Sequence, residues 1–184
     1  MEKFIPVVVI KELGETDKIL KALKNNGINC AEITFRTACA AEAIAYAVKN
    51  YPDMEIGAGT VINAAQCEQA LAAGATFIVS PGLSIPVAKI CNERNIPYYP
   101  GCVTPTEIMA ALDLGITTVK FFPANIYGGL KALKALSAPF PQVKFIPTGG
   151  VDRSNIDEFL AFDKIAAIGG SFFVKESLDK MENA

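Results

Sequence analysis

The sequence predicts an α/β fold, a (β/α)8 TIM barrel formed by a single domain over residues 1–184. Short runs rich in β-branched or aromatic residues start 21 to 26 residues apart, and each is followed by residues with helical periodicity. The runs begin near Ile5, Cys30, Ile56, Phe77, Tyr98, Val119, Lys144 and Ile165. Eight such strand–helix units are typical of a closed parallel barrel with its helices outside.

The segments between the runs carry helix patterns and helix-end signals. Ile19, Leu20 and Leu23 share one face of the first expected helix. Thr104-Pro105-Thr106-Glu107 combines a cap, a proline at the first helical position and a capping-box glutamate, while Asn63 and Ser154 are candidate caps elsewhere. Three glycines stand where a left-handed residue would end a helix just before the next strand: Gly27, Gly74 and Gly115. These signals set the expected order of elements.

An open, doubly wound sheet is the competing fold, partly because the chain is shorter than the usual barrel domain. That fold normally has fewer strands at this length and a Gly-x-Gly-x-x-Gly turn after its first strand. This chain has Lys11-Glu12-Leu13-Gly14 there instead. The pattern therefore favours the barrel.

The composition excludes several kinds of chemistry. The 184 residues include no histidine, which rules out Ser-His-Asp and Cys-His catalysis, a histidine base and imidazole-ligated metal sites. The formal net charge of −2 indicates no broad basic surface for nucleic acid. Catalysis would have to use lysine, carboxylates, cysteine, tyrosine, backbone dipoles or a carboxylate-held metal.

The sequence also gives expectations about compartment. The apolar run from Phe4 to Ile10 is too short to span a membrane, and no signal-cleavage pattern follows it. The five cysteines contain no Cys-x-x-Cys spacing, which is typical of reduced thiols. We therefore expect a cytoplasmic protein that binds no membrane.

A lysine interrupts the sixth expected strand, Thr118-Val119-Lys120-Phe121-Phe122-Pro123. Because strand side chains alternate, Lys120 lies opposite the face of Val119 and Phe121, and it points into the barrel if those two pack under the helices. Burial favours the neutral amine, which can attack a ketone and form a Schiff base. The alternative is a lysine whose side chain extends to solvent at the barrel rim.

The second expected strand places a carboxylate on the same inner side. In Cys30-Ala31-Glu32-Ile33-Thr34-Phe35-Arg36, Glu32 alternates with apolar neighbours and would face Lys120. Glu32 could shuttle protons, or the two residues could form a buried structural ion pair. Arg36 follows at the carboxyl-terminal rim, where it could bind a substrate carboxylate, although taken singly it fits an ordinary surface arginine.

Glycine-rich turns follow three expected strands. Thr148-Gly149-Gly150 and Gly169-Gly170-Ser171 come after the last two strands, where barrels often bind phosphate with backbone N–H groups. Gly57-Ala58-Gly59-Thr60 after the third strand is weaker evidence, because any such segment can be a plain tight turn. We predict a phosphate site at the two turns that follow the last two strands.

Taken in order, these segments resemble one family, the 2-keto-3-deoxy-6-phosphogluconate aldolases, which also act as 4-hydroxy-2-oxoglutarate aldolases. The matching segments are Glu-Ile-Thr-Phe-Arg-Thr (32–37), Gly-Ala-Gly-Thr-Val (57–61), Ser-Pro-Gly (80–82), Lys-Phe-Phe-Pro-Ala (120–124), Pro-Thr-Gly-Gly (147–150) and Ile-Gly-Gly-Ser (168–171). They cover nearly the whole chain. The sequence differs at its ends, since family members often begin with a helix before the first strand and the last helix here is short.

The resemblance implies a role for each matched residue. It makes Lys120 the Schiff-base lysine and Glu32 the general acid and base. The remaining implied contacts are Arg36 and Thr60 to the pyruvate portion, Pro81 and Phe122 along the site, Thr148 to the substrate chain, and Gly149, Gly150, Gly170 and Ser171 to the phosphate. It further implies a class I aldolase that acts on a small 2-keto acid, needs no metal or cofactor and forms a homotrimer.

Three alternatives stay open. The nearest alternative is an aldolase for the galactonate epimer, whose substrate differs at a single stereocentre, although Arg36 and Thr148 favour the gluconate-type and hydroxyoxoglutarate enzymes. A phosphate-binding isomerase or synthase barrel would use the last two turns without an inward lysine. An inactive barrel could persist as a metabolite-binding or assembly subunit, although the presence of both Lys120 and Glu32 argues against it.

Overall fold

The computed structural model describes residues 2–183, which form an α/β fold in which parallel strands alternate with helices. The strands are β1 (Phe4–Val8), β2 (Cys30–Thr34), β3 (Glu55–Gly59), β4 (Ile78–Val79), β5 (Tyr98–Tyr99), β6 (Thr118–Phe121), β7 (Lys144–Pro147) and β8 (Ile168–Gly170). The helices are α1 (Glu15–Asn25), α2 (Ala40–Asn50), α3 (Ala64–Ala72), α4 (Ile85–Glu93), α5 (Pro105–Asp113), α6 (Gly129–Ser137), α7 (Ile156–Leu160) and α8 (Phe172–Glu182). The predicted order of elements is confirmed.

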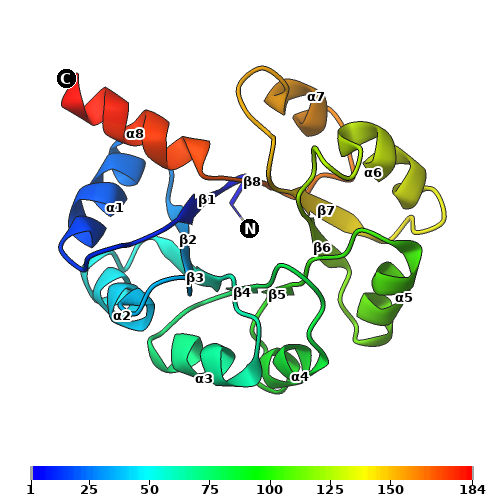
Figure 1. Ribbon diagram of the computed structural model, residues 1–184, viewed down its shortest axis with the longest axis horizontal. Helices are drawn as coiled ribbons and strands as arrows, with labels where there is room; N and C mark the ends of the chain where they lie inside the picture. Colours follow the sequence, from blue (N-terminus) through cyan, green and yellow to red (C-terminus); the bar gives the residue numbers. More distant parts are fainter. Residues whose placement is uncertain (1, 184) are drawn as a thin grey trace.

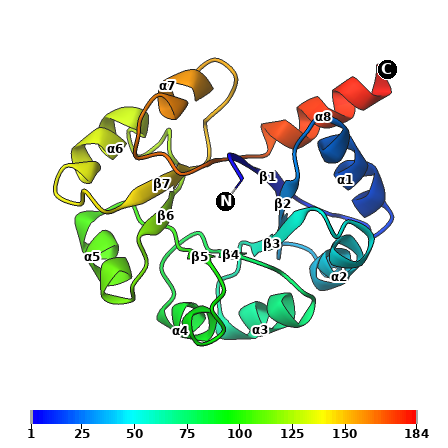
Figure 2. The same ribbon diagram turned by 180° about the vertical axis from the view of Figure 1, so that it is seen from behind.

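The strands form a curled sheet with the helices on its outside (Figures 1 and 2). Six strands are hydrogen-bonded in the order β5-β4-β3-β2-β1-β8, and β6 pairs with β7. Single parallel bridges join the two groups, at Gly101–Lys120 on one side and at Phe145–Ile165 and Thr148–Gly169 on the other. The strands are thus hydrogen-bonded in two parallel sheets, of six and two strands, where the sequence predicted one closed barrel.

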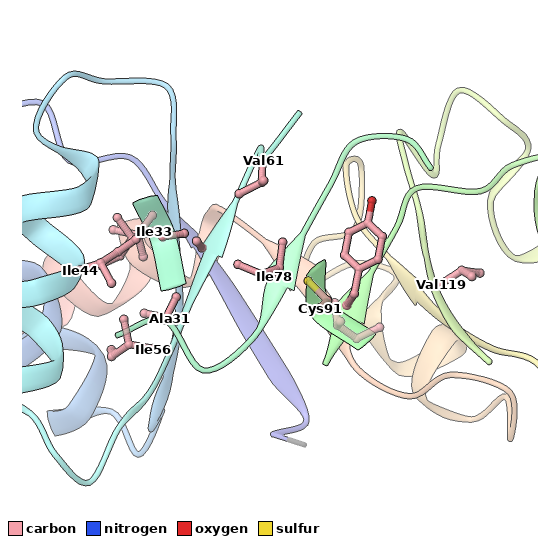
Figure 3. Close-up of a cluster of buried hydrophobic side chains, with 14 of the residues drawn as sticks. Ala31, Ile33, Ile44, Ile56, Val61, Ile78, Cys91 and Val119 are labelled. Atoms are coloured by element: carbon pink, nitrogen blue, oxygen red, sulfur yellow. The ribbon is translucent and has the colours of Figure 1, made fainter. Parts of the chain in front are cut away.

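Side-chain alternation along the strands divides the core into two clusters. Outward residues pack under the helices, as Ala31 and Ile33 of β2 do in the cluster that includes Ile44 of α2 (Figure 3). Inward residues form a smaller cluster on the concave side of the sheet: Ile5, Cys30, Phe77, Val79, Tyr99, Ile146 and Ala167. Burial on both faces explains why the strands are apolar at nearly every position.

Most predicted helix ends are confirmed. Thr104 and Glu107 form a complete capping box, and Asn63 Oδ1 accepts a hydrogen bond from the Gln66 amide at 2.9 Å. The three glycines predicted to end helices have left-handed backbones, with φ values of +73° at Gly27, +96° at Gly74 and +76° at Gly115. They relieve the strain that a side chain would meet there.

Two local predictions were wrong. Ser154 does not cap α7, because its hydroxyl and amide both donate to Asp152 Oδ1 and the helix begins after Asn155. The last strand begins at Ile168, later than the predicted Ile165. Ile165 instead follows a turn in which its amide donates to the Phe162 carbonyl at 3.0 Å. Both errors arise where local hydrogen bonds compete with a regular element.

Within residues 2–183, no helix is long and apolar enough to cross a membrane.

Tyr99 gives the inner cluster a pH dependence. Burial, with smaller effects from Glu55 and Cys30, raises the pKa of Tyr99 from 10.0 to about 12. The folded state therefore disfavours the phenolate. The resulting contribution of Tyr99 to the free energy of unfolding is complete below pH 10 and is lost as the pH rises toward 12. We expect Tyr99→Phe to remove on the order of 1 kcal/mol of this alkaline loss, measured by urea unfolding at about pH 8 and about pH 11. The exposed Tyr127→Phe is the control, and equal losses in wild type and Tyr99→Phe would contradict the expectation.

Candidate active site

A cavity of about 360 Å³ lies at the carboxyl ends of the strands. Eight of the eleven expected site residues line it: Arg36, Lys120, Phe122, Thr148, Gly149, Gly150, Gly170 and Ser171. The strand ends bring them together from four separate parts of the chain, β2, β6, β7 and β8. A neighbouring hollow of about 410 Å³ runs along α8 but does not reach Lys120. The smaller cavity is therefore the candidate site.

Lys120 lines this cavity, and Glu32, which does not line it, contacts Lys120. Their side chains are 5% and 2% exposed, and Lys120 Nζ lies 3.6 Å from Glu32 Oε1. This separation permits an ion-pair contact but is longer than a hydrogen bond, and Glu32 Oε1 has no hydrogen-bond partner among the described residues. Lys120 Nζ also lies 5.1 Å from the centre of the Phe122 ring. The predicted inward pair is confirmed as a contact between two buried groups.

The backbone holds Lys120 rigidly. Its amide donates to the Pro100 carbonyl at 2.8 Å, and its carbonyl accepts from the Cys102 amide at 2.9 Å. On the other side, Lys120 pairs with Ile146 of β7. Lys120 therefore stands on a rigid strand, which limits movement of its amine relative to Glu32.

Burial changes the proton affinity of Glu32. Desolvation raises the pKa of this carboxyl above its usual value, and the nearby Lys120 and Arg36 charges oppose the shift without cancelling it. A carboxyl with a raised pKa can hold a proton closer to neutral pH and then release it, as a general acid and base must. The same environment also suits a structural ion pair, so the role needs a kinetic test.

Gly59 makes room for the Glu32 side chain. A Cβ atom at this position on β3 would lie 1.8 Å from Glu32 Oε1, far inside van der Waals contact. We expect Gly59→Ala to displace the carboxylate and lower kcat about 100-fold, because an error of 1 Å in placement can cost that much. Steady-state kinetics, with circular dichroism to confirm folding, would measure it. Gly82→Ala is the matched control, since its Cβ would meet nothing within 4 Å. Unchanged kcat in Gly59→Ala would contradict this account.

Arg36 is anchored beside the cavity. Its Nε donates to Thr60 Oγ1 at 3.0 Å, which joins the end of β2 to the turn after β3. Thr60 has a left-handed backbone with φ of +54°, a conformation that is uncommon for residues other than glycine. Thr60 does not line the cavity itself, but it fixes a guanidinium that does. This arrangement suits the binding of a substrate carboxylate.

The opposite side of the cavity is built from backbone. Gly149 and Gly150 follow β7 with φ values of +85° and +76°, and a side chain at Gly150 would collide with Asn125. Gly170 ends β8, and Ser171 stands at the N-terminus of α8. Buried Thr148 lies between the two turns, where Gly169 leaves room for its hydroxyl. Backbone N–H groups and a helix N-terminus at one place favour an anion.

Pro81 is not brought to this cavity. It lines a separate hollow of about 210 Å³ together with Val61, Ile62 and Leu83. Its carbonyl packs against Gly101, which has no space for a side chain. The position of Pro81 therefore gives no support for direct contact with a ligand in the 360 Å³ cavity.

Four further residues line the cavity that were not predicted from the sequence: Val7, Val9, Val151 and Phe172. Val7 and Val9 follow the same alternation as the inward Ile5, so the strand pattern contained a signal for them. Val151 and Phe172 follow the two glycine-rich turns and carried no comparable signal. Among residues 2–183, no group of three or more His, Cys, Asp or Glu side chains is gathered as for a metal ion.

Known proteins resemble this chain over most of its length. The model of the family described as "Aldolase: KDPG and KHG aldolase" matches residues 1–184. The 2-dehydro-3-deoxy-phosphogluconate aldolase of Haemophilus influenzae is 42% identical over 181 residues, covering 98% of this chain and 85% of that protein. The KHG/KDPG aldolase of Escherichia coli K12 is 44% identical over 170 residues, covering 92% and 80%.

Solved structures agree in fold. The KDPG aldolase of Legionella pneumophila, with pyruvate captured at low pH as a covalent carbinolamine intermediate, superposes with a TM-score of 0.92 at 41% identity, covering 98% of this chain and 88% of that one. The 2-keto-3-deoxy-6-phosphogluconate aldolase of Zymomonas mobilis ZM4, with 3-phosphoglycerate, gives 0.90 at 37% identity, covering 96% and 90%.

Together, the parallel α/β fold, the buried lysine–carboxylate pair and these similarities define an aldolase, a carbon–carbon lyase. Its relatives at 40–44% identity are consistently KDPG or KHG/KDPG aldolases. The chain belongs to the KDPG and KHG aldolase family.

Proposed function

We propose that this protein is a class I aldolase that cleaves 2-keto-3-deoxy-6-phosphogluconate to pyruvate and glyceraldehyde 3-phosphate. It would also cleave 4-hydroxy-2-oxoglutarate to pyruvate and glyoxylate. The observation that carries the proposal is the buried pair of Lys120 and Glu32, 3.6 Å apart, with Lys120 lining the cavity. The pyruvate carbinolamine in the Legionella relative supports covalent chemistry at such a site.

The reaction begins at Lys120. Its neutral amine attacks the C2 ketone, and the resulting carbinolamine loses water with a proton supplied by Glu32, which leaves an iminium. The raised pKa of Glu32 suits this step, because the carboxyl must be protonated to donate. The iminium then serves as an electron sink for cleavage of the next bond.

Cleavage reverses the direction of proton transfer. The Glu32 carboxylate takes the proton of the C4 hydroxyl as the C3–C4 bond breaks. The electron pair of that bond moves into the enamine on Lys120. Glyceraldehyde 3-phosphate leaves. Protonation of the enamine at C3 and hydrolysis of the iminium then release pyruvate and restore the free amine.

Other groups orient the substrate. Arg36, held by Thr60, binds the carboxylate of the 2-keto acid, while Phe122 lines the site and Thr148 contacts the chain. Gly149, Gly150, Gly170 and Ser171 bind the phosphate through backbone N–H groups and the serine hydroxyl. Binding the phosphate far from the reacting bond positions C4 for cleavage. In this proposal Pro81 shapes the site from behind Gly101, without touching the substrate.

The proposal extends to the architecture. The eight strands would close into a (β/α)8 barrel, supported by the bridges Gly101–Lys120 and Thr148–Gly169, and the chain would act as a single domain. A cytoplasmic homotrimer follows from the family resemblance, and analytical ultracentrifugation would test the trimer. A solved structure described as "Native KDPGal structure" is 23% identical with a TM-score of 0.84, a likeness that supports the fold alone. The galactonate epimer is therefore a substrate to be assayed.

A borohydride experiment tests the central step. The protein is incubated with pyruvate and sodium borohydride, digested, and analysed by mass spectrometry for a reduced pyruvate adduct. The proposal expects the adduct on Lys120, together with cleavage of the phosphorylated substrate in a coupled assay. An inactive binding barrel would form neither, and an isomerase would form no adduct.

A further inference from the structure

An arginine outside the candidate site joins the two segments that would bind the phosphate. Arg153 belongs to the turn after β7, and Glu176 belongs to α8, which begins directly after Ser171. Arg153 Nε and Nη2 donate to Glu176 Oε2 at 2.9 and 2.7 Å, and Nε lies 3.1 Å from Oε1. In Figure 1, α7 and α8 lie on either side of β8.

The Arg153 guanidinium makes more contacts than that of a typical surface ion pair. Most exposed pairs contribute little, because solvent screens them and two long side chains must be ordered. Here the planar fork binds the carboxylate through several hydrogen bonds, and the guanidinium also lies 5.6 and 5.8 Å from the ring centres of Phe172 and Phe173. These rings are the first two residues of α8, so Arg153 is fixed against the start of the helix as well as its second turn.

Hydrogen bonds connect both ends of this contact to the backbone that would bind the phosphate. On the β7 side, Asn155 Nδ2 donates to the Gly150 carbonyl at 3.0 Å, and Asn155 Oδ1 accepts from the Asp152 amide at 3.0 Å. Arg153 lies inside that hydrogen-bonded turn. On the α8 side, the Val174 amide donates to the Ser171 carbonyl at 3.1 Å. A shift of Arg153 relative to Glu176 would therefore move Gly150 relative to Ser171.

We propose that the Arg153–Glu176 pair is a positioning device for phosphate recognition. It sets the separation between the Gly149–Gly150 turn and the start of α8, and thereby favours phosphorylated over unphosphorylated substrate. Arg153 acts through the backbone and does not bind the phosphate, since its charge is already paired with Glu176. The inference rests on the proposed function, because it assumes that this side of the cavity holds a phosphate.

The test compares one substrate with a phosphate and one without. For Arg153→Ala, we expect the KM for 2-keto-3-deoxy-6-phosphogluconate to rise about tenfold, as for loss of one good hydrogen bond to the phosphate, with kcat within about twofold. Cleavage of 4-hydroxy-2-oxoglutarate should stay within about twofold of wild type. Glu176→Gln should reproduce this pattern, because it removes the anchor and leaves the arginine in place.

Glu176→Gln also separates positioning from simple charge. If Arg153 acted by direct attraction, releasing it from Glu176 would lower the KM for the phosphorylated substrate, and Arg153→Lys would behave as wild type. Positioning predicts a higher KM for Glu176→Gln and incomplete rescue by lysine, which lacks the planar fork. Lys18→Ala is the matched control, since it removes another exposed ion pair of α8, the 2.9 Å contact with Glu182, at the far end of the helix.

Three results would overturn the inference. A KM within about twofold of wild type in both Arg153→Ala and Glu176→Gln would show an ordinary surface pair. An equal loss of cleavage activity toward both substrates would show that the pair supports the fold generally. A wild-type protein that forms the pyruvate adduct without preferring the phosphorylated substrate would leave the Schiff-base chemistry standing and remove the phosphate assumption. Absence of the adduct would instead contradict the proposed function itself.

Discussion

Replacing Lys120 with alanine is expected to abolish aldol cleavage, with kcat lowered by about 10⁴-fold or more. Without the amine no iminium forms, and the electrons of the C3–C4 bond have no acceptor. The pyruvate adduct trapped by borohydride should disappear from the peptide that contains residue 120. Coupled kinetics and peptide mass spectrometry measure the two effects independently.

Folding must be controlled in this experiment, because Lys120 is buried beside a carboxyl group. Lys120→Met keeps most of the side-chain volume, and Glu32 can remain protonated because its pKa is raised. Lys144→Ala tests an exposed lysine at the start of β7, distant from the cavity, and should retain full activity. An adduct that persists in Lys120→Met would show that another amine forms the Schiff base.

Glu32→Gln is expected to lower kcat by about 10²- to 10⁴-fold, the usual contribution of a positioned general acid and base. The amide has nearly the same shape but cannot exchange a proton with the carbinolamine or the C4 hydroxyl. Binding of substrate should change less than turnover, so the loss should appear mainly in kcat. Stopped-flow measurement of adduct formation would identify the slowed step.

Stability distinguishes this role from a structural ion pair. Breaking a buried pair that mainly supports the fold costs about 3–5 kcal/mol, because one charge is left without its partner. If the pair serves catalysis, the free energy of unfolding of Glu32→Gln should lie within about 1 kcal/mol of the wild-type value, well below the cost of breaking a structural pair. A large loss of stability with normal activity per folded molecule would favour the structural alternative.

The regular parts of this fold could be predicted because their signals are local. Strand alternation placed Lys120 and Glu32 on inner faces, and the capping box at Thr104 and Glu107 marked the start of α5. Ser154 does not cap the helix because its hydroxyl donates to Asp152 Oδ1 instead. Residue type alone does not determine which polar neighbour a serine hydrogen-bonds to. Pro81 was assigned to the site by resemblance, which gives no information on the distances between residues. The structure places Pro81 in another hollow.

Sequence by itself determined the chemistry available to this protein. Four features of the sequence restrict the reaction independently of the tertiary structure: the absence of histidine, a lysine inside one apolar strand, a glutamate inside another, and two glycine-rich turns. Tertiary structure alone decided which of these groups meet. Residues 32 and 120 are far apart in the chain, and parallel strands bring them within 3.6 Å in a buried environment, where desolvation raises the pKa of Glu32. The Arg153–Glu176 contact has the same origin, because a hydrogen bond between two surface elements depends on packing that no local pattern encodes.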